Sequence, residues 1–242
     1  MFERPHHQRI AQVLLALNGP LLRKHCCLFG GGTAVALHYG EYRESVDIDF
    51  LVSDIACYRR LRLLLTESPG GIAAILRKNV GSLTQTHEIR ADQYGIRTML
   101  LVADRQIKFE IILEGRIKLD PPGKDDEICE IATLSPLDMI TCKLLANSDR
   151  WADDGIFSRD LIDLAMMQPS VNLLRRAVTK AEQAYGNAVT RDLGKAIDKM
   201  QIRRDWLDRC VKAMAIHTPK ALLWERIRTL KRNLKYGANL SC

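Results

Sequence analysis

Two acidic residues lie one residue apart at the start of a short apolar run. On a β-strand, Asp47 and Asp49 would point to one face while their apolar neighbours point to the other, toward a core. Carboxylates held this close together repel each other unless a cation neutralises them. The spacing therefore predicts a site for a divalent metal ion, and the alternative is a strand end with two solvated acids.

A third acidic residue could complete that site from a later strand. Glu110 alternates with Phe109 and Ile111, so its carboxylate would lie on the opposite face of the sheet from these two side chains. Three acids can hold a pair of Mg²⁺ ions. The alternative is an exposed ion pair between Glu110 and Lys108, which shares its face.

A run of glycines precedes the acidic pair along the chain. Gly30, Gly31, Gly32 and Thr33 lie between a short apolar run and a helical stretch. Glycines allow a ligand to approach the backbone closely, and the N-terminus of a helix carries partial positive charge, so this turn could cradle a phosphate. The alternative is a turn whose glycines only permit tight packing.

Two helices predicted beyond Pro136 carry charged residues at helical spacing. On the first, Lys143, Asn147 and Arg150 share a face on which two cations could meet a triphosphate. On the second, Asp160 and Asp163 are three residues apart and also share a face. The alternatives are a solvated basic face on the first helix and, on the second, a cap or local salt bridge, which is the role we favour for Asp163.

The elements expected to hold these residues fall into two parts. The expected helices of the first part cover residues 9–22, 34–39 and 55–65, and the expected strands cover residues 26–29, 48–52, 95–102 and 107–111. Helices follow Ser135, with breaks near Pro169, Gly186 and residues 217–219. The sequence thus predicts an α+β fold, with a mixed sheet in residues 1–133 and a helical domain in residues 134–242.

Taken in chain order, these motifs resemble one known family. The opening motif of the AbiEii/AbiGii-type toxin family, nucleotidyltransferases of the polymerase-beta-like superfamily, is similar to Gly31-Gly32-Thr33-Ala34-Val35-Ala36-Leu37 followed by Arg43-x-Ser45-x-Asp47-Ile48-Asp49-Phe50. The family's later Lys/Ala/Arg helix and R/K-D-x-x-D helix are similar to 138–146 with Arg150 and to 159–164. The resemblance covers roughly residues 25–168.

The resemblance implies a polymerase-beta-like nucleotidyltransferase core, a C-terminal helical lobe, and transfer of a nucleoside monophosphate from an NTP with Mg²⁺ or Mn²⁺ as cofactor. It implies a toxin of a toxin–antitoxin or phage-defence system, with tRNA as the expected acceptor and an antitoxin as a partner. The expected catalytic residues are Asp47, Asp49, Lys143 and Asp160; the nucleotide contacts are Gly31, Gly32, Thr33, Ser45, Lys143 and Arg150; and the metal ligands are Asp47, Asp49 and Glu110. Two alternatives stay open: nucleotidylation of a protein hydroxyl, and a non-catalytic module that binds a nucleotide or an antitoxin.

The overall composition is compatible with that activity. A net charge of +7 lowers the electrostatic cost of approaching RNA, although many basic proteins bind no nucleic acid. Seven cysteines without a C-x-x-C pair favour a reducing cytoplasm over a disulfide framework or a zinc site. The chain has no apolar run near ~18 residues and no apolar leader, so we expect neither membrane insertion nor secretion. The last predicted helix, from Ala221, has an apolar stripe and basic residues around the rest, so it could grip RNA, dock an antitoxin or face solvent.

Overall fold

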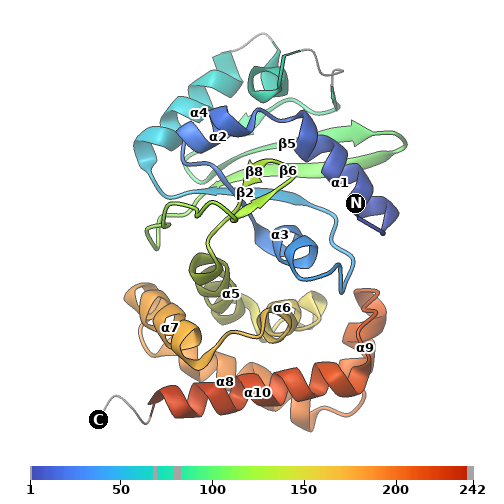
Figure 1. The fold of residues 1–242 in the computed structure, drawn as a ribbon, viewed down its shortest axis with the longest axis vertical. Coiled ribbons are helices and arrows are strands. Elements are labelled where there is room, and N and C mark those ends of the chain that lie inside the picture. The colour runs from blue at the N-terminus through green and yellow to red at the C-terminus, as the bar shows by residue number, and fades with distance from the viewer. Residues whose placement is uncertain (1, 68–69, 79–82, 239–242) are drawn as a thin grey trace. The chain divides into compact units, whose positions relative to one another are not determined.

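The computed structural model describes residues 2–67, 70–78 and 83–238 of the chain (Figure 1). The chain divides into two compact units. The first unit comprises Met1–Glu41 with Ser45–Ser135, and the second comprises Tyr42–Glu44 with Pro136–Cys242. The boundary expected from the sequence lies between residues 133 and 134 and leaves residues 42–44 in the first part, whereas their contacts group these three residues with the second unit.

A mixed sheet forms the centre of the first unit. The described residues of this sheet follow the order β1-β2-β6-β5-β3, and β4 pairs with β5. β2 and β6 run parallel and the other pairs are antiparallel, so the predicted mixed sheet is confirmed. The strands are β1 (Leu28–Gly30), β2 (Ile48–Val52), β3 (Thr84–Gln85), β4 (Arg90–Ala91), β5 (Gly95–Val102) and β6 (Arg105–Leu113). A separate hairpin of β7 (Glu127–Ile128) and β8 (Ile131–Ala132) was not predicted, because strands of two residues leave no alternating pattern.

The helices of the first unit are α1 (Pro5–Ala16), α2 (Gly19–Lys24), α3 (Gly31–His38), α4 (Ile55–Glu67) and the 3₁₀ helix η1 (Gly71–Ile75). The opening helix expected over residues 9–22, whose pattern Asn18-Gly19-Pro20 interrupts, is divided into α1 and α2. Leu17 is extended, with ψ 150°, and the Asn18 side chain accepts a hydrogen bond from the Leu21 N–H at 3.0 Å. Asn18 is therefore the N-cap of a new helix, and Pro20 lies in its first turn, where its missing N–H costs nothing.

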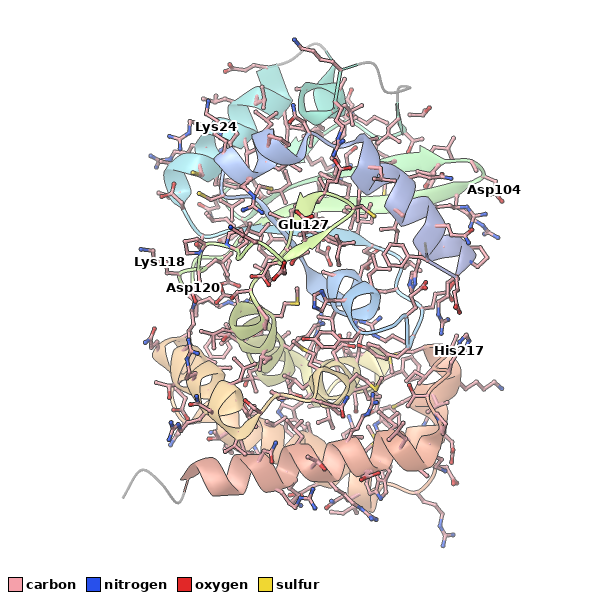
Figure 2. The ribbon with its side chains drawn as sticks, viewed as in Figure 1. Lys24, Asp104, Lys118, Asp120, Glu127 and His217 are labelled. Carbon is pink, nitrogen blue, oxygen red and sulfur yellow. The ribbon has the colours of Figure 1, made fainter. Side chains whose placement is uncertain are left out.

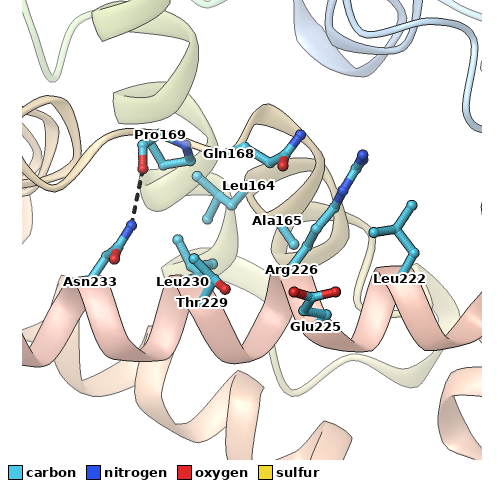
Figure 3. A pocket seen from close by; sticks show the side chains of 10 residues that line it. All are labelled: Leu164, Ala165, Gln168, Pro169, Leu222, Glu225, Arg226, Thr229, Leu230 and Asn233. Atoms are coloured by element: carbon cyan, nitrogen blue, oxygen red, sulfur yellow. Dashed lines mark hydrogen bonds between the residues drawn. The ribbon is translucent and has the colours of Figure 1, made fainter.

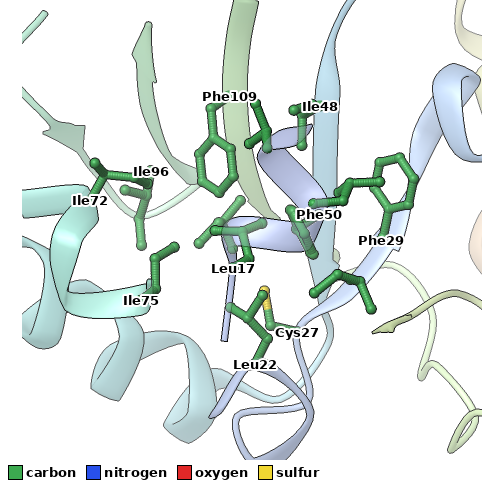
Figure 4. Close-up of a cluster of buried hydrophobic side chains, with 14 of the residues drawn as sticks. Leu17, Leu22, Cys27, Phe29, Ile48, Phe50, Ile72, Ile75, Ile96 and Phe109 are labelled. Atoms are coloured by element: carbon green, nitrogen blue, oxygen red, sulfur yellow. The ribbon is translucent and has the colours of Figure 1, made fainter. Parts of the chain in front are cut away.

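One face of this sheet is buried against helices. The Phe50 ring packs at a tilt against Phe29 and Phe109, with a centroid distance of 5.6 Å to each, and Leu17 at the end of α1 joins the same cluster (Figure 4). Because side chains alternate along a strand, the residues between these core positions point to the other face. Asp49 and Glu110 are such residues, so the core on one face fixes where the acids lie on the other.

The second unit is helical. Its elements are α5 (Pro136–Arg150), the 3₁₀ helix η2 (Asp154–Ile156), α6 (Arg159–Met167), α7 (Val171–Tyr185), α8 (Ala188–Ile202), α9 (Trp206–Ala213) and α10 (Lys220–Ala238). The breaks expected near Pro169, Gly186 and residues 217–219 are confirmed. The two separate helices expected to carry Lys143 and Asp160 are confirmed as α5 and α6. The break before α9 was not predicted; Asp205 takes a left-handed conformation there.

Trp206 is a large buried side chain of the second unit, and a cavity lies beside α10. Trp206 is fully buried and its indole N–H donates to Ser158 Oγ at 2.9 Å. A cavity of about 270 Å³ lies between the C-terminal end of α6 and α10, where Asn233 donates to the Pro169 carbonyl at 3.2 Å (Figure 3). In the part of the chain described here, no helix is both long and apolar enough to cross a bilayer.

Candidate active site

The carboxylate of Asp49 packs against the first residue of α3. Gly30 pairs with Asp49 across β1 and β2, and Gly31, which follows it, has φ +68°. A Cβ on Gly31 would lie 2.4 Å from Asp49 Oδ2, so only glycine leaves room for the acid in this position. The carboxylate thereby lies beside the partial positive charge of a helix N-terminus.

Thr33 fixes the backbone that leads into β2. It is almost fully buried, its hydroxyl donates to the Asp47 carbonyl at 2.5 Å, and that hydroxyl lies 2.8 Å from Ser45 Oγ. Both hydroxyls predicted to contact a nucleotide are therefore hydrogen-bonded within the protein. Their observed contacts position Asp47 at the start of the strand.

His7 holds the same segment from α1. The Ser45 N–H donates to His7 Nε2 at 3.2 Å, and His7 Nδ1 lies 2.7 Å from Glu41 Oε1. Burial lowers the pKa of His7 although Glu41 opposes the shift. A neutral ring with the proton on Nδ1 satisfies both contacts, because Nε2 must accept. No pattern in the sequence predicted this role for His7.

Asp47 and Asp49 lie at the beginning of β2 and both are half-buried. Asp47 makes no ion pair within 4.0 Å among residues 2–67, 70–78 and 83–238. Its carboxylate is thus not neutralised by a described basic side chain. Two carboxylates of this spacing are oxygen donors of the kind that Mg²⁺ prefers.

Glu110 is the register partner of Asp49 in the parallel β2–β6 pair, so the two acids are neighbours on one sheet face. The Glu110 carboxylate is bound by Arg97 Nε at 2.8 Å and by the Lys108 ammonium. The side chain of Glu110 is 12% exposed and that of Lys108 is 45% exposed, so the pair that we considered as the alternative does form. Within the described ranges, no three His, Cys, Asp or Glu side chains are grouped to hold a metal ion, and the three-acid site stays a prediction.

A buried ion network lies in the second unit. Asp163 is fully buried and its carboxylate accepts two hydrogen bonds from Arg43, from Nε at 2.7 Å and from Nη2 at 3.0 Å. The Tyr42 hydroxyl donates to the same carboxylate at 2.5 Å, and Lys143 Nζ lies 2.6 Å from it. Asp163 therefore joins α6, α5 and the segment 42–44.

Asp160 forms the other half of this network. Arg150 binds its carboxylate through Nε at 2.7 Å and Nη2 at 2.9 Å, and Lys143 Nζ lies 3.2 Å away. Lys143 is thus shared by two carboxylates. The shared face predicted for Lys143 and Arg150 is confirmed, since both contact Asp160.

The network keeps both acids ionised. Burial alone would raise the pKa of Asp163, but Arg43 and Lys143 outweigh it and hold the pKa well below its usual range. Burial is likewise outweighed at Asp160, whose pKa is lowered by Lys143 and Arg150. Burial beside Asp163 raises the pKa of Tyr42 well above its usual range, so its hydroxyl stays protonated and donates.

One expectation for this network is wrong and two of its members were missed. Asp163 does not form a local salt bridge, because Arg43 lies 120 residues away in sequence. Arg43 belongs to the opening motif, but the sequence predicted no role for it or for the neighbouring Tyr42. A buried arginine needs a carboxylate partner, so an apolar environment around Arg43 would have been the signal to look for. Periodicity in the loop between α3 and β2 could not supply this signal.

Comparisons with known proteins agree with this architecture. Two crystal structures from Helicobacter pylori match the chain, one of a protein provisionally named a nucleotidyltransferase and one of JHP933. The first is 19% identical with a TM-score of 0.55 and covers 98% of this chain and 96% of its own. The second is 18% identical with a TM-score of 0.55 and covers 100% and 97%. At this identity the likeness shows the fold, and the predicted α+β fold is confirmed.

No curated protein matches the chain. A family model described as the nucleotidyl transferase AbiEii toxin of type IV toxin–antitoxin systems matches residues 13–230. The match spans both units and includes every residue of the two acidic sites described above. The chain therefore belongs to the AbiEii nucleotidyl transferase toxin family.

Proposed function

We propose that this protein is an Mg²⁺-dependent enzyme that transfers a nucleoside monophosphate from an NTP to RNA, with tRNA as the acceptor, as the toxin of a toxin–antitoxin pair. The observation that carries the proposal is the placement of Asp49 against Gly31, with Asp47 one residue before the strand. In the reaction, an acceptor hydroxyl oxygen bonds to the α-phosphorus. The bond from that phosphorus to the bridging β-phosphate oxygen breaks, pyrophosphate leaves, and the hydroxyl proton passes to a base or to water.

Asp47 and Asp49 would hold the metal ion. A bound Mg²⁺ would neutralise charge on the α-phosphate and on the departing pyrophosphate. Glu110 could extend the site, since it is the register neighbour of Asp49, but its carboxylate must first exchange Arg97 and Lys108 for the ion. Gly31 contributes indirectly, because the absence of a Cβ at this position leaves room for the Asp49 carboxylate.

The ion network of the second unit has the charge that a phosphate needs. Its ion pairs join three cations, Arg43, Lys143 and Arg150, to the two carboxylates of Asp160 and Asp163. Arg150 is the most accessible of the three, with its side chain 35% exposed. We propose that Lys143 and Arg150 bind phosphate oxygens of the nucleotide, and that Asp160, which contacts both cations, orients them.

The test is incorporation of label. Purified full-length protein is incubated with Mg²⁺, total tRNA and each α-labelled NTP in turn, and RNA is separated from protein on a gel. We expect one nucleotide to label RNA, and Asp49→Asn to lower that labelling by about 100-fold or more, since it removes a predicted metal ligand and keeps the shape. Chelation of Mg²⁺ should abolish labelling of RNA.

Asp104→Asn is the matched control. Asp104 lies at the turn between β5 and β6 (Figure 2), and its side chain is 69% exposed in a surface pair with Arg9. This variant should label RNA like the wild type. Full labelling by Asp49→Asn would refute the metal-site assignment. Label on protein instead of RNA would favour nucleotidylation of a protein hydroxyl, and binding of NTP without transfer would favour a non-catalytic module.

A further inference from the structure

A second concave site lies wholly within the second unit. It is a cavity of about 600 Å³ between the end of α8, the start of α9 and the start of α10. Trp206 and Leu207 line its apolar part, and Trp224 on α10 lines it as well. The reaction proposed above uses none of the residues that line this cavity, although the start of the basic last helix, from Ala221, forms one side of it.

Aromatic rings and guanidinium groups alternate around this cavity. Trp206 is fully buried and the Arg203 guanidinium lies 4.2 Å above the centroid of its ring, so this stacked pair forms one wall of the cavity. Trp224 is only half-buried, and the Arg228 guanidinium lies 5.3 Å from its centroid. Trp224 therefore keeps aromatic surface available next to a cation, which is the arrangement that binds bases in single-stranded nucleic acids.

The charges around the cavity are not balanced. Arg203 pairs with Asp154 at 2.5 Å and Lys220 pairs with Asp208 at 2.6 Å. Arg204, which lines the cavity, and Arg228 make no ion pair within 4.0 Å in the described portion of the chain. One lining carboxylate, Asp205, is in the same state, so a positive excess remains.

From this geometry we infer that the cavity binds one unstacked base of a single-stranded RNA. The base would stack on Trp224, and the adjoining phosphates would lie at Arg204 and Arg228. The inference rests on the proposed function in that RNA is the acceptor there. It differs from an RNA grip along the far part of α10, where Lys231 is already paired with Asp198 at 2.9 Å.

Binding is measured without any NTP, so that it is independent of transfer. Full-length protein is titrated into a labelled twelve-nucleotide oligouridylate, and fluorescence anisotropy gives the Kd at several salt concentrations. We expect Trp224→Leu to weaken binding about tenfold, because leucine keeps apolar bulk but has no ring face. Trp224→Phe should restore binding close to the wild-type value. Duplex RNA of equal length should compete poorly.

Charge variants test the phosphate contacts. Arg204→Glu should weaken binding and reduce its dependence on salt, because fewer counterions are released. Asp205→Asn should strengthen binding slightly, because it removes the uncompensated carboxylate. Arg175→Glu on α7 and Tyr94→Leu in the first unit are the matched controls, since both side chains are exposed and lie outside the cavity.

The outcomes separate this inference from the proposed function. If Trp224→Leu and Arg204→Glu bind the oligonucleotide like the wild type, or if the wild type does not bind it, the inference is wrong. It is also wrong if these variants lose only a polypeptide partner. Loss of labelling by Asp49→Asn with RNA binding intact concerns the transferase chemistry alone and leaves the cavity assignment standing.

Discussion

In the second unit, Asp160 and Asp163 are almost completely buried and share three cations, whereas in the first unit Asp47 is half-buried and has no ion pair within the described ranges. Asp160 and Asp163 form one pair of acids close in sequence, and Asp47 and Asp49 form another, so the difference lies in the surroundings of the two pairs. A buried carboxylate must be neutralised by the protein itself, because moving an isolated charge from water into the protein interior costs roughly several kcal/mol of free energy. A carboxylate at the surface of a sheet can instead be neutralised by a cation that binds from solution.

The two pairs therefore serve the molecule differently. The pair in the second unit is held by three basic side chains and stabilises the structure of that unit. The acids on β2 present negative charge beside a helix N-terminus, which suits a metal ion. Substitutions should reveal this difference. Removing Asp160 or Asp163 should lower the stability of the fold, whereas changes beside Asp49 should lower the rate of the reaction.

The largest effect on stability is expected for Asp163→Ala. This change leaves the Arg43 guanidinium and the Lys143 ammonium short of an acceptor, and it removes the acceptor of the Tyr42 hydroxyl. Breaking a buried ion pair by removing one partner costs about 3–5 kcal/mol of unfolding free energy. Urea unfolding at pH 7, followed by circular dichroism, measures the loss.

Asp198→Ala is the control for that experiment. Asp198 pairs with Lys231 at 2.9 Å, but its side chain is 55% exposed, so its removal should change the unfolding free energy by about 1 kcal/mol or less. Equal shifts for the two variants would mean that burial does not distinguish the acids of this protein.

A smaller loss of stability and a large loss of activity are expected for Gly31→Ala. The φ of +68° is unfavourable for alanine by about 1–2 kcal/mol, and the new Cβ must displace the Asp49 carboxylate. A displacement of about 1 Å at a reacting centre can lower the rate about 100-fold. The labelling assay and urea unfolding, applied to the same preparation, separate the two effects.

Gly194→Ala provides the opposite outcome from the same substitution. A Cβ at Gly194, inside α8, meets no atom within 4 Å, so alanine should raise stability by about 0.5–1 kcal/mol and leave labelling unchanged. If Gly31→Ala retained full labelling, the close approach of Gly31 to Asp49 would not matter for the reaction.

The sequence predicted what repeats with a period and missed what depends on distant partners. The β2 strand, its two acids and the glycines before α3 were found because alternation and glycine runs are local signals. The shared face of Lys143 and Arg150 followed from helix geometry in the same way. Asp163 was misjudged because its partner, Arg43, comes from a loop of the other half of the sequence.

The same limit applies to the third acid. The β2–β6 register that places Glu110 beside Asp49 agrees with the sequence expectation for that face. The strand pattern also identified Lys108 as a neighbour, but Arg97 comes from β5, and strand pairing decides which residue it faces. Cross-strand partners depend on register, which a single strand does not encode.

The smallest expected effect is a difference in pH range between the two units. Burial lowers the pKa of His7 below its ordinary value of 6.5, so below pH 6.5 the unfolded chain takes up a proton that folded His7 resists, and stability falls. Asp160 and Asp163 have lowered pKa values, so their contribution is complete above pH 3.8 and is lost only as the pH falls below it. Urea midpoints measured from pH 7.5 to pH 3 should therefore decline in two steps.

His7→Gln should reduce the upper step, because the glutamine amide can accept from the Ser45 N–H and does not titrate. Burial also lowers the pKa of His25, which supplies the remainder of this step. His217→Gln is the matched control, since His217 is exposed (Figure 2) and its substitution should leave both steps unchanged. An upper step of unchanged size in His7→Gln would assign the titration to another group. Retention of that step would also remove the reason to regard α1 as the support that holds Ser45 and the residues leading into β2.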